Sequence, residues 1–496
     1  MSNRASAHDL ETLIQSFHSL IAIETVEEER VESILREVAA DLRQPLYTWS
    51  LTTGLQRSHI GSIEGTTEAL MALQYIESEA PPDGIFLLKD LVPHLSAHNV
   101  SRTLRDLAQK LTATRSAMIL TGEPLELPRD LDSIAVHFRL HLPNDQEMLE
   151  MIRSVVDAVG TRQRIEVDLT RPDAQKLVRS LAGLTLSQAR RVIAQAIVHD
   201  NKLSAPDIER VLRSKGEIIE KSGVLEFFPV ESNACELGGF ARLKSWLDEA
   251  RTGFLPEARK MNLRPPKGVL LVGVQGCGKS LAAKFIARQW GLPLLKLDAG
   301  RLYDKYVGET EKRFRKAIAL AEAMAPVVLW IDEIEKAFSS GGSADADGGL
   351  STRLFGALLT WLNDKTAGVF VVGAANDLMG VPPELLRKGR FDEIFFVDLP
   401  EEAERQSIFS IHLQLRKQPA QSFDLAALSG ASDGFSGAEI EQATVSALYR
   451  SLHARVPLTT AALLEALKST VPLSITRRED VARLRAEAQG RFRPVA

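Results

Sequence analysis

One eight-residue stretch constrains the chain most, because its residue types suit a tight turn around a phosphate group. Residues 273–280 start with glycine, leave four positions and end in Gly-Lys-Ser. Glycines let the backbone curl until several N–H groups point at one anion. In this pattern Lys279 reaches the outer phosphates of a nucleotide such as ATP, and the hydroxyl of Ser280 binds Mg2+. The residues predicted to contact the nucleotide here are Gly276, Cys277, Gly278, Lys279, Ser280 and Leu281.

The segments on both sides of this stretch agree with that interpretation. Residues 267–272 form a short apolar run, as in a buried parallel strand, and residues 281–287 have helical spacing. A helix that starts near Leu281 would present its positive N-terminus to the same phosphates. A chance match in a surface loop is the alternative, but it predicts neither the strand nor the helix.

A second apolar run ends in two carboxylates. Residues 327–331 are apolar, and Asp332 and Glu333 follow them. Beside a phosphate loop, a carboxylate at the C-terminal end of a strand can hold Mg2+ through water, and we assign this role to Asp332. Glu333 is then placed to orient and deprotonate the water that attacks ATP. The alternative is a solvated strand end without a chemical role.

Composition argues against several other classes of protein. A chain of 496 residues has room for three or four domains. Its net charge of −5 provides no basic field for nucleic acid or an anionic membrane. Two cysteines, Cys235 and Cys277, cannot form a disulfide framework, which fits a reducing compartment. Without a long apolar run or a signal peptide, we expect a soluble cytoplasmic protein.

The N-terminal part alternates between apolar strands and amphipathic helices. Strands separated by helices predict a doubly wound parallel sheet, so the fold class is α/β. The predicted strands cover residues 19–25, 46–51, 84–90 and 117–122, and the predicted helices cover residues 7–17, 27–42, 66–77 and 99–112.

Beyond Leu142 the pattern predicts only helices until a second α/β segment begins. The order of a sheet followed by helices therefore occurs twice. The predicted divisions are an α/β domain at 1–144, a helical lid-like domain at 145–221, a linker at 222–235, a large α/β domain at 236–400 and a C-terminal helical lid at 401–496.

We hypothesise that the first half is a structural relative of the second that has lost its nucleotide site. After its first strand, residues 25–30 contain three consecutive glutamates where the second half has glycines, and these carboxylates would repel a triphosphate. Asp90 ends a strand but is followed by Leu91 rather than a second carboxylate. The alternative, an unrelated α/β domain, is open at this point, since alternation alone is a weak topological signal.

Further motifs lie on both sides of the phosphate loop in a fixed order, residues 235–239 before it and residues 369–376, 386–392 and 434–439 after it. With them, residues 236–496 resemble the AAA family of AAA+ ATPases, which are ring-forming mechanoenzymes. The resemblance implies that Asn376 senses the γ-phosphate and positions water. It also implies that Arg387 and Arg390 are arginine fingers that enter the site of a neighbouring subunit in a hexamer. Surface salt bridges are the alternative role for these arginines.

The same resemblance assigns residues around the adenosine and around a central pore. Gly437 and Ala438 lie in the lid turn that touches the adenosine, and His412 falls near the base. Residues 305–311 resemble the loop that lines the pore, so Lys305, Tyr306 and Val307 would grip an extended polypeptide. Tyr306 packing into its own domain is the alternative.

The phosphate loop departs from the usual family sequence at Cys277. A helix N-terminus and Lys279 would favour its thiolate and make it a target for oxidation. The simpler interpretation is a small residue in a tight loop. Over its full length the chain resembles an AAA group known from plastid reading frames and cyanobacteria, in which a degenerate AAA-like half precedes an active one.

Two functions follow from these features. The first is ATP hydrolysis coupled to remodelling or threading of protein substrates through a central pore. The second is an ATP-gated assembly switch, whose first half binds a partner without threading anything. A nucleic-acid motor is disfavoured by the acidic balance, and the absence of a His-Glu-x-x-His motif leaves a fused zinc protease unsupported.

Overall fold

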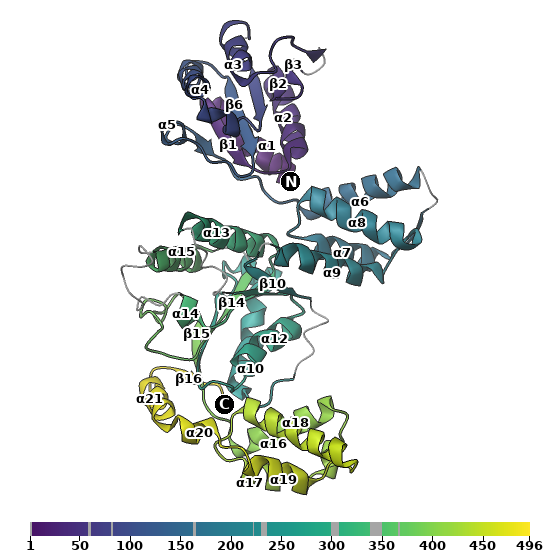
Figure 1. Ribbon diagram of the computed structural model, residues 1–496, viewed down its shortest axis with the longest axis vertical. Coiled ribbons are helices and arrows are strands. Elements are labelled where there is room, and N and C mark those ends of the chain that lie inside the picture. The colour runs from purple at the N-terminus through teal and green to yellow at the C-terminus, as the bar shows by residue number, and fades with distance from the viewer. Residues whose placement is uncertain are drawn as a thin grey trace. The chain divides into compact units, whose positions relative to one another are not determined.

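The computed structural model describes residues 2–57, 61–80, 83–161, 165–221, 223–229, 236–298, 307–337, 350–365 and 368–496. Figure 1 shows the chain, which divides into two compact units, Met1–Leu212 and Arg213–Ala496. Each unit has its own sheet and its own group of helices.

The sheet of the first unit contains the four predicted strands and three others. Its order is β4-β3-β2-β5-β6-β1-β7, and all neighbours are parallel except β3 with β2 and β4 with β3. The strands are β1 (Leu20–Glu24), β2 (Leu46–Ser50), β3 (Gly54–Arg57), β4 (Gly61–Ser62), β5 (Ile85–Lys89), β6 (Ala117–Gly122) and β7 (Val136–His137).

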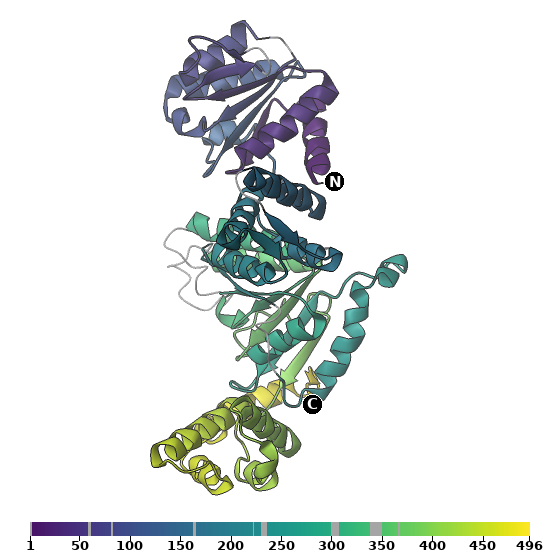
Figure 2. The same cartoon turned by 90° about the vertical axis from the view of Figure 1, so that its right-hand side faces the viewer.

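Helices cover both faces of this sheet, as the near-continuous apolar strands require. Ile21 and Ile23 of β1 pack in a buried cluster with α1 and α2, whereas Leu20 and Ala22 pack in the cluster of α3 and α4. Figure 2 shows the purple α1 and α2 together on one side of the sheet. The helices are α1 (Ser2–Gln15), α2 (Glu28–Leu42), α3 (Ala69–Ser78), η1 (Val92–Ser96), α4 (His98–Leu111) and α5 (Arg129–Asp132).

The sequence pattern predicts helices near residues 145–159, 173–183, 187–197 and 205–221, and the described part of the helical region that follows contains four helices there. These helices are α6 (Asp145–Gly160), α7 (Arg171–Leu181), α8 (Leu186–Asp200) and α9 (Asp207–Glu220). The last of them, α9, runs across the boundary between the units. The prediction of helices alone is wrong for two short parallel strands, β8 (Glu166–Asp168) and β9 (Lys202–Ser204). Three residues are too few to show an alternating pattern, and Leu203 alone is buried there.

The sheet of the second unit has the order β10-β12-β13-β14-β11-β15-β16. All neighbours are parallel except β10 with β12. The strands are β10 (Leu225–Phe228), β11 (Gly268–Gly273), β12 (Leu294–Leu297), β13 (Val327–Ile331), β14 (Val369–Ala375), β15 (Glu393–Val397) and β16 (Arg493–Pro494).

Two predicted boundaries do not agree with this sheet. The predicted linker at 222–235 contains β10, whose alternate residues Leu225 and Phe227 are buried. The predicted C-terminal lid contains β16, which pairs with β15 and so belongs to the large sheet. Both strands lie at sheet edges and are short, so neither carries a strong pattern in the sequence.

When the parallel strands of each sheet are numbered along the chain, the first five have the same spatial order in both halves. In the first half this order is β2-β5-β6-β1-β7, and in the second it is β12-β13-β14-β11-β15. In both cases the first strand lies between the fourth and the fifth. An antiparallel strand is added beside the second strand in each sheet, β3 in one and β10 in the other. This agreement supports the hypothesis that the two halves are structural relatives.

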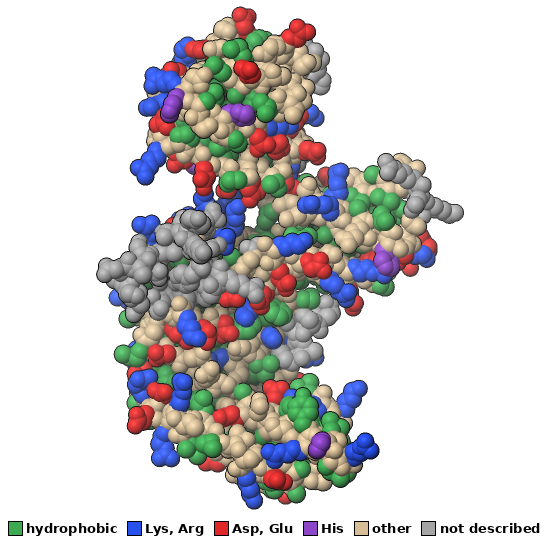
Figure 3. Space-filling view, in the orientation of Figure 1, with side chains coloured by type: hydrophobic (Ala, Val, Ile, Leu, Met, Phe, Trp, Pro, Cys, Tyr) green, Lys and Arg blue, Asp and Glu red, His purple; other side chains and the backbone are tan. Residues whose placement is uncertain are grey.

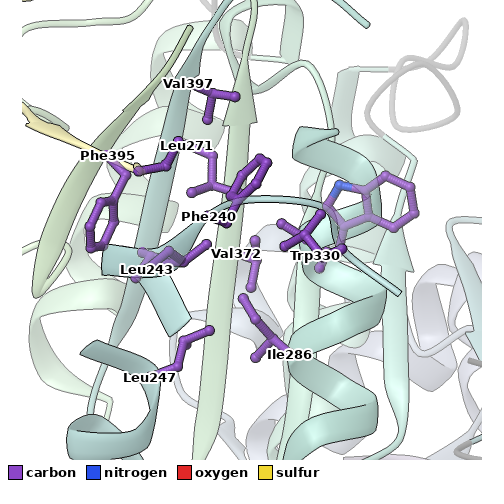
Figure 4. Close-up of a cluster of buried hydrophobic side chains, with 14 of the residues drawn as sticks. Phe240, Leu243, Leu247, Leu271, Ile286, Trp330, Val372, Phe395 and Val397 are labelled. Atoms are coloured by element: carbon purple, nitrogen blue, oxygen red, sulfur yellow. The ribbon is translucent and has the colours of Figure 1, made fainter. Parts of the chain in front are cut away.

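The core of the second unit forms where α10 and α12 cover one face of its sheet. Figure 4 shows Leu243 and Leu247 of α10 and Ile286 of α12 turned toward Leu271 and Val372 of the strands. The helices of this α/β part are α10 (Ala241–Arg251), η3 (Thr252–Phe254), α11 (Pro256–Lys260), α12 (Lys279–Trp290), α13 (Val307–Ala323), α14 (Ile334–Ala337) and α15 (Leu350–Asp364).

The chain then enters a helical lid and returns to the sheet. In the lid, α16 packs on α17 and on α18, which starts at a capping box formed by Ser436 and Glu439. The elements are α16 (Glu402–Leu415), η4 (Ala420–Ser422), α17 (Leu425–Ala431), α18 (Gly437–Ala454), α19 (Thr460–Lys468), α20 (Leu473–Thr476) and α21 (Arg478–Ala488).

On the described part of the face in Figure 3, basic and acidic side chains are interspersed rather than gathered by sign. Among the described helices, none combines the length and the apolar content that a membrane span needs.

Candidate functional site

The glycine loop adopts the geometry that its sequence predicts. All residues of β11 are buried, and the loop follows directly. Gly276 and Gly278 have φ angles of 78° and 91°, a region that favours glycine. A Cβ on Gly273 would lie 1.9 Å from the carbonyl oxygen of Val397, so the strand end tolerates no side chain. Helix α12 starts at Lys279, two residues before the predicted start at Leu281.

A cavity of about 630 Å³ opens above this loop, a volume in the range of small-molecule sites. The α/β part and the lid both line it. Twelve predicted site residues line this cavity: Gly276, Cys277, Gly278, Lys279, Ser280, Leu281, Asp332, Glu333, Asn376, His412, Gly437 and Ala438.

Lys279 is the central cation of the site. Its Nζ donates hydrogen bonds of 2.8 Å to the carbonyl oxygens of Gly273 and Val274. Only 6% of the residue is exposed, and this burial lowers the pKa of Lys279 to about 8. Since burial disfavours the ammonium, an anion beside it would restore the charged form. The side chain therefore favours a bound phosphate group.

The two carboxylates after β13 have different surroundings. Burial, the largest influence, raises the pKa of Asp332, and its Oδ1 accepts the N–H of Glu333 at 3.2 Å. Glu333 has a left-handed backbone, with φ of 47°, and its Oε1 accepts a hydrogen bond of 2.8 Å from Nζ of Lys336. Nearby cations and backbone N–H groups thus hold both carboxylates at the cavity wall.

Sequence reasoning missed a third acid, Glu335. Its side chain is buried and accepts the backbone N–H of Asn376 at 3.0 Å, which fixes the end of β14 where that amide lies. Burial raises the pKa of Glu335. A Cβ on Gly380 would lie 3.0 Å from the Cβ of Glu335, so the surrounding loop is closely packed. No local pattern marks Glu335, because its partner Asn376 lies far away in the sequence.

The lid closes the far side of the cavity. The N–H of Ala438, at the start of α18, donates to the carbonyl oxygen of Gly276 at 3.0 Å. The Nδ1 of His412 lies 3.3 Å from Nη1 of Arg416 and 3.8 Å from Oε1 of Glu441. Burial is the largest influence on the pKa of His412 and lowers it, which favours the neutral ring.

The apolar wall of the cavity was not predicted in full. Ile408 and Ile411 of α16 line it beside His412, and Leu237 lines it from the segment before α10. The spacing of Ile408, Ile411 and His412 places them on one face of a helix, which could have indicated this wall. The wall suits a flat, largely apolar group such as a nucleobase.

Arg387 and Arg390 do not line the cavity of their own chain. Arg387 is exposed, and Nη1 of Arg390 donates to the carbonyl oxygen of Leu359 at 3.2 Å. Lys305 and Tyr306 lie outside the described residues, as does the side chain of Val307, which is the first residue of α13. The predicted roles of these five residues stay predictions.

The structure contradicts the thiolate interpretation of Cys277. Its thiol is buried, and burial raises the pKa of Cys277 to about 12, which outweighs the attraction of Lys279. The thiol is therefore neutral at physiological pH and packs with the apolar residues behind the loop. The simpler interpretation agrees with this environment.

Three family models match the chain. The model for the ATPase family associated with various cellular activities (AAA) matches residues 269–399, which include the phosphate loop and both strand-end acids. The model for the N-terminal domain of SpoVK-like AAA ATPases matches residues 6–140, and the model for their second domain matches residues 146–222.

Curated relatives match the chain along most of its length. It is similar to the uncharacterized AAA domain-containing protein ycf46 of Trieres chinensis, at 37% identity over 98% of this chain and 97% of the relative. The protein of that name from Pyropia yezoensis is 37% identical over 98% of each chain. ATPase family gene 2 protein homolog A of Homo sapiens is 36% identical over 41% of this chain and 23% of its own length. The chain therefore belongs to the AAA ATPase family, in the group of AAA domain-containing proteins that includes ycf46.

Proposed function

We propose that the protein hydrolyses ATP in the cavity above the glycine loop. The observation that carries this proposal is that Lys279, Asp332, Glu333 and Asn376 line one cavity although they come from separate parts of the sequence. Phosphoryl transfer needs cations for the phosphates, a residue that activates water and a residue that orients it. In this proposal Lys279 is the cation for the phosphates, Glu333 activates water and Asn376 orients it. Asp332 would add a second cation by holding Mg2+.

Each residue has a separate role in the proposed reaction. Lys279 binds the outer phosphates, and its preference for an adjacent anion follows from its buried position. Glu333 takes the proton of the attacking water, and Asn376 orients that water. Oxygen ligands suit Mg2+, so the hydroxyl of Ser280 and the carboxylate of Asp332, which line the same cavity, would hold it. When bound, Mg2+ would neutralise charge on the phosphates.

We further propose that the site is completed by a neighbouring subunit. Arg387 and Arg390 are separated from their own cavity, and Arg387 is exposed, as a residue that acts across an interface must be. Such arginines stabilise the charge of the transition state and are worth roughly 10³–10⁵ in rate. Head-to-tail contacts of this kind close into rings, and a hexamer is the assembly that we propose.

We propose two candidates for the work that ATP drives. Our first candidate is the remodelling or threading of protein substrates through a pore lined by Lys305, Tyr306 and Val307. The second is an ATP-gated switch that assembles with a partner protein. The second is supported by the first half, which has a complete core but glutamates at 27–29 where a nucleotide site needs glycines.

We also propose the cytoplasmic location and the division into domains, the latter without the two boundaries that β10 and β16 contradict. A reducing compartment is supported by the cysteine content and by the free, buried thiol of Cys277.

The test of ATP hydrolysis compares Glu333→Gln with Lys279→Ala. Glu333→Gln should retain ATP while turnover falls by about 10²–10⁴, because water activation is lost and phosphate binding is not. Lys279→Ala should lose binding itself. Glu249→Gln, a change of an exposed carboxylate on α10, serves as the control. Turnover in Glu333→Gln close to that of the control would show that another group is the base.

A further inference from the structure

The first half carries charged side chains at the positions where the second half carries its phosphate loop. Glu27 is the third residue after β1, as Gly276 is the third after β11, and Arg30 is the sixth, as Lys279 is in the second half. Arg30 and Lys279 are each 6% exposed. The equivalent loop thus keeps a buried cation, although its glycines are gone.

The helix that faces this loop also has the same form in both halves. Helix α8 is the third α-helix of the first helical region, after α6 and α7. Helix α18 is the third α-helix of the lid, after α16 and α17. Both start after a glycine with positive φ, Gly183 at 86° and Gly434 at 76°. Both start at a capping box, with Thr185 and Ser436 as the N-cap residues. Each helix therefore presents a fixed set of N–H groups to the loop beside it.

The second N–H of each helix binds the loop, but it binds a different group. In the second half Ala438 donates to the backbone carbonyl of Gly276, beside an open cavity. In the first half Ser187 donates to Oε1 of Glu27 at 3.2 Å. The first half therefore presents its own carboxylate to the N-terminus of this helix, a position that favours an anion.

A buried arginine extends this contact to a second helix of the same region. Nη1 of Arg30 lies 3.3 Å from Oε2 of Glu27, and its Nη2 lies 3.6 Å from Oε1 of Glu147. Glu147 belongs to the capping box of α6, with Asn144 as N-cap. The side chains of Glu27 and Arg30 are each 5% exposed and that of Glu147 is 10% exposed. The loop of the sheet is thus bound to α6 and to α8.

All groups in these contacts belong to the chain itself, so none of them can leave as a bound ligand can. A bound nucleotide comes and goes, so a lid held by it changes position, whereas a carboxylate of the chain is always present. Opening the region would break the hydrogen bond from the N–H of Ser187 to Glu27 and separate Arg30 from Glu147. We propose that Glu27 and Arg30 hold the helical region of the first half closed on its sheet in every nucleotide state. The first half is then a rigid module, and this inference does not depend on the proposed ATPase activity.

Distances between spin labels test the proposal in the full-length protein. Asp41→Cys on α2 and Val198→Cys on α8, both at exposed positions, report on the first half. Glu249→Cys on α10 and Tyr449→Cys on α18 form the matched pair in the second half. Both pairs are placed in a background with Cys235→Ser and Cys277→Ser, whose ATP binding is first shown to equal that of the wild type because Cys277 lines the cavity.

Double electron–electron resonance then compares the apo, ADP and ATP states, the last trapped by Glu333→Gln. We expect one narrow distance in the first half that is the same in all three states, and a distance in the second half that shifts with ATP. A shift or a broad distribution in the first half would overturn the proposal. A second half that does not respond would count against the proposed ATP site only, so the two failures are distinguishable.

Variants of the loop test the role of the charges directly. Glu27→Ala should at least double the width of the first-half distribution, because the helix N-terminus and Arg30 both lose a partner. The matched control is Glu29→Ala, which removes an exposed carboxylate from the first turn of α2 and should change nothing. If circular dichroism shows that Glu27→Ala is unfolded, Glu27→Gln replaces it; it keeps an acceptor oxygen but loses the ion pair, so a smaller broadening is expected. A folded variant with an unchanged narrow distribution would contradict the proposal.

Discussion

At the scale of the residue, the proposed base Glu333 has an unusual backbone conformation. Glu333 has a positive φ, which is rare for a residue with a side chain, and its carboxylate is paired with Lys336 one turn later. Such strain is common at functional sites, where the surrounding structure enforces it. The pair also occupies Oε1 of Glu333, so that oxygen is turned to Lys336 and cannot accept a hydrogen bond from the attacking water while the contact is made.

Lys336→Met should therefore increase basal ATP turnover. The pair is largely exposed, with 66% of the Lys336 side chain accessible, so the gain should be modest, about two- to fivefold in kcat, with little change in KM. Lys336→Arg keeps the charge and should behave like the wild type. The check is steady-state ATP hydrolysis, and a loss of kcat in Lys336→Met would mean that the lysine assists catalysis.

The buried ammonium of Lys279 makes ATP binding depend on pH. The pKa of Lys279 is lowered to about 8 without nucleotide, and bound phosphate should raise it again. Above pH 8 binding must therefore take up a proton, so Kd should rise by about tenfold per pH unit. Calorimetry or fluorescence titration between pH 7 and 10 measures this. Lys279→Arg should bind with no such slope, and a slope in that variant would assign the effect to another group.

The lowered pKa of Lys279 also affects the stability of the fold, which rises with pH where ATP binding weakens. The unfolded lysine keeps its proton up to its ordinary pKa of 10.5, whereas the folded one loses it near 8. Between these values the unfolded state binds more protons, so this lysine makes the second unit more stable as pH rises.

At the scale of the element, the sequence predicted those parts that have a long or regular pattern. The buried strands of the first sheet, the helices α6 to α9 and the loop at 273–280 were all visible, because apolar runs and glycine spacing dominate there. The short edge strands β10 and β16 were not, since pairing rather than local pattern creates them. Within the site, Glu335 was missed because its role, a hydrogen bond to the N–H of Asn376, exists only after folding.

Gly273→Ala tests how closely the strands are packed at the site. The new Cβ would lie 1.9 Å from the carbonyl oxygen of Val397, so the sheet must shift, at a cost of about 1–3 kcal/mol. Gly291→Ala is the matched control, because Gly291 has φ of 66° but no heavy atom within 4 Å of its Cβ position. Urea unfolding of the full chain should show a larger loss for Gly273→Ala. Equal losses would show that backbone conformation, rather than space, sets the cost.

At the scale of the whole molecule, one strand order is used twice for different purposes. The second half has an open cavity beside its glycine loop, and the first half has a carboxylate and an arginine at the equivalent positions. Alternation in the sequence predicted two α/β halves, but their common strand order could only be read from the paired strands. The second half is thus suited to bind a ligand that is exchanged, and the first half is suited to keep one conformation.

The shared site between neighbouring subunits is the central claim, and co-expression of two inactive variants tests it most directly. One variant is Glu333→Gln, and the other carries Arg387→Ala with Arg390→Ala; each should hydrolyse almost no ATP alone. In mixed rings, an intact Glu333 and intact arginines meet at about a quarter of the interfaces, so turnover should return to about a quarter of the wild-type rate. A mixture that is no more active than either variant alone, or full activity of the arginine variant as a monomer, would contradict the claim.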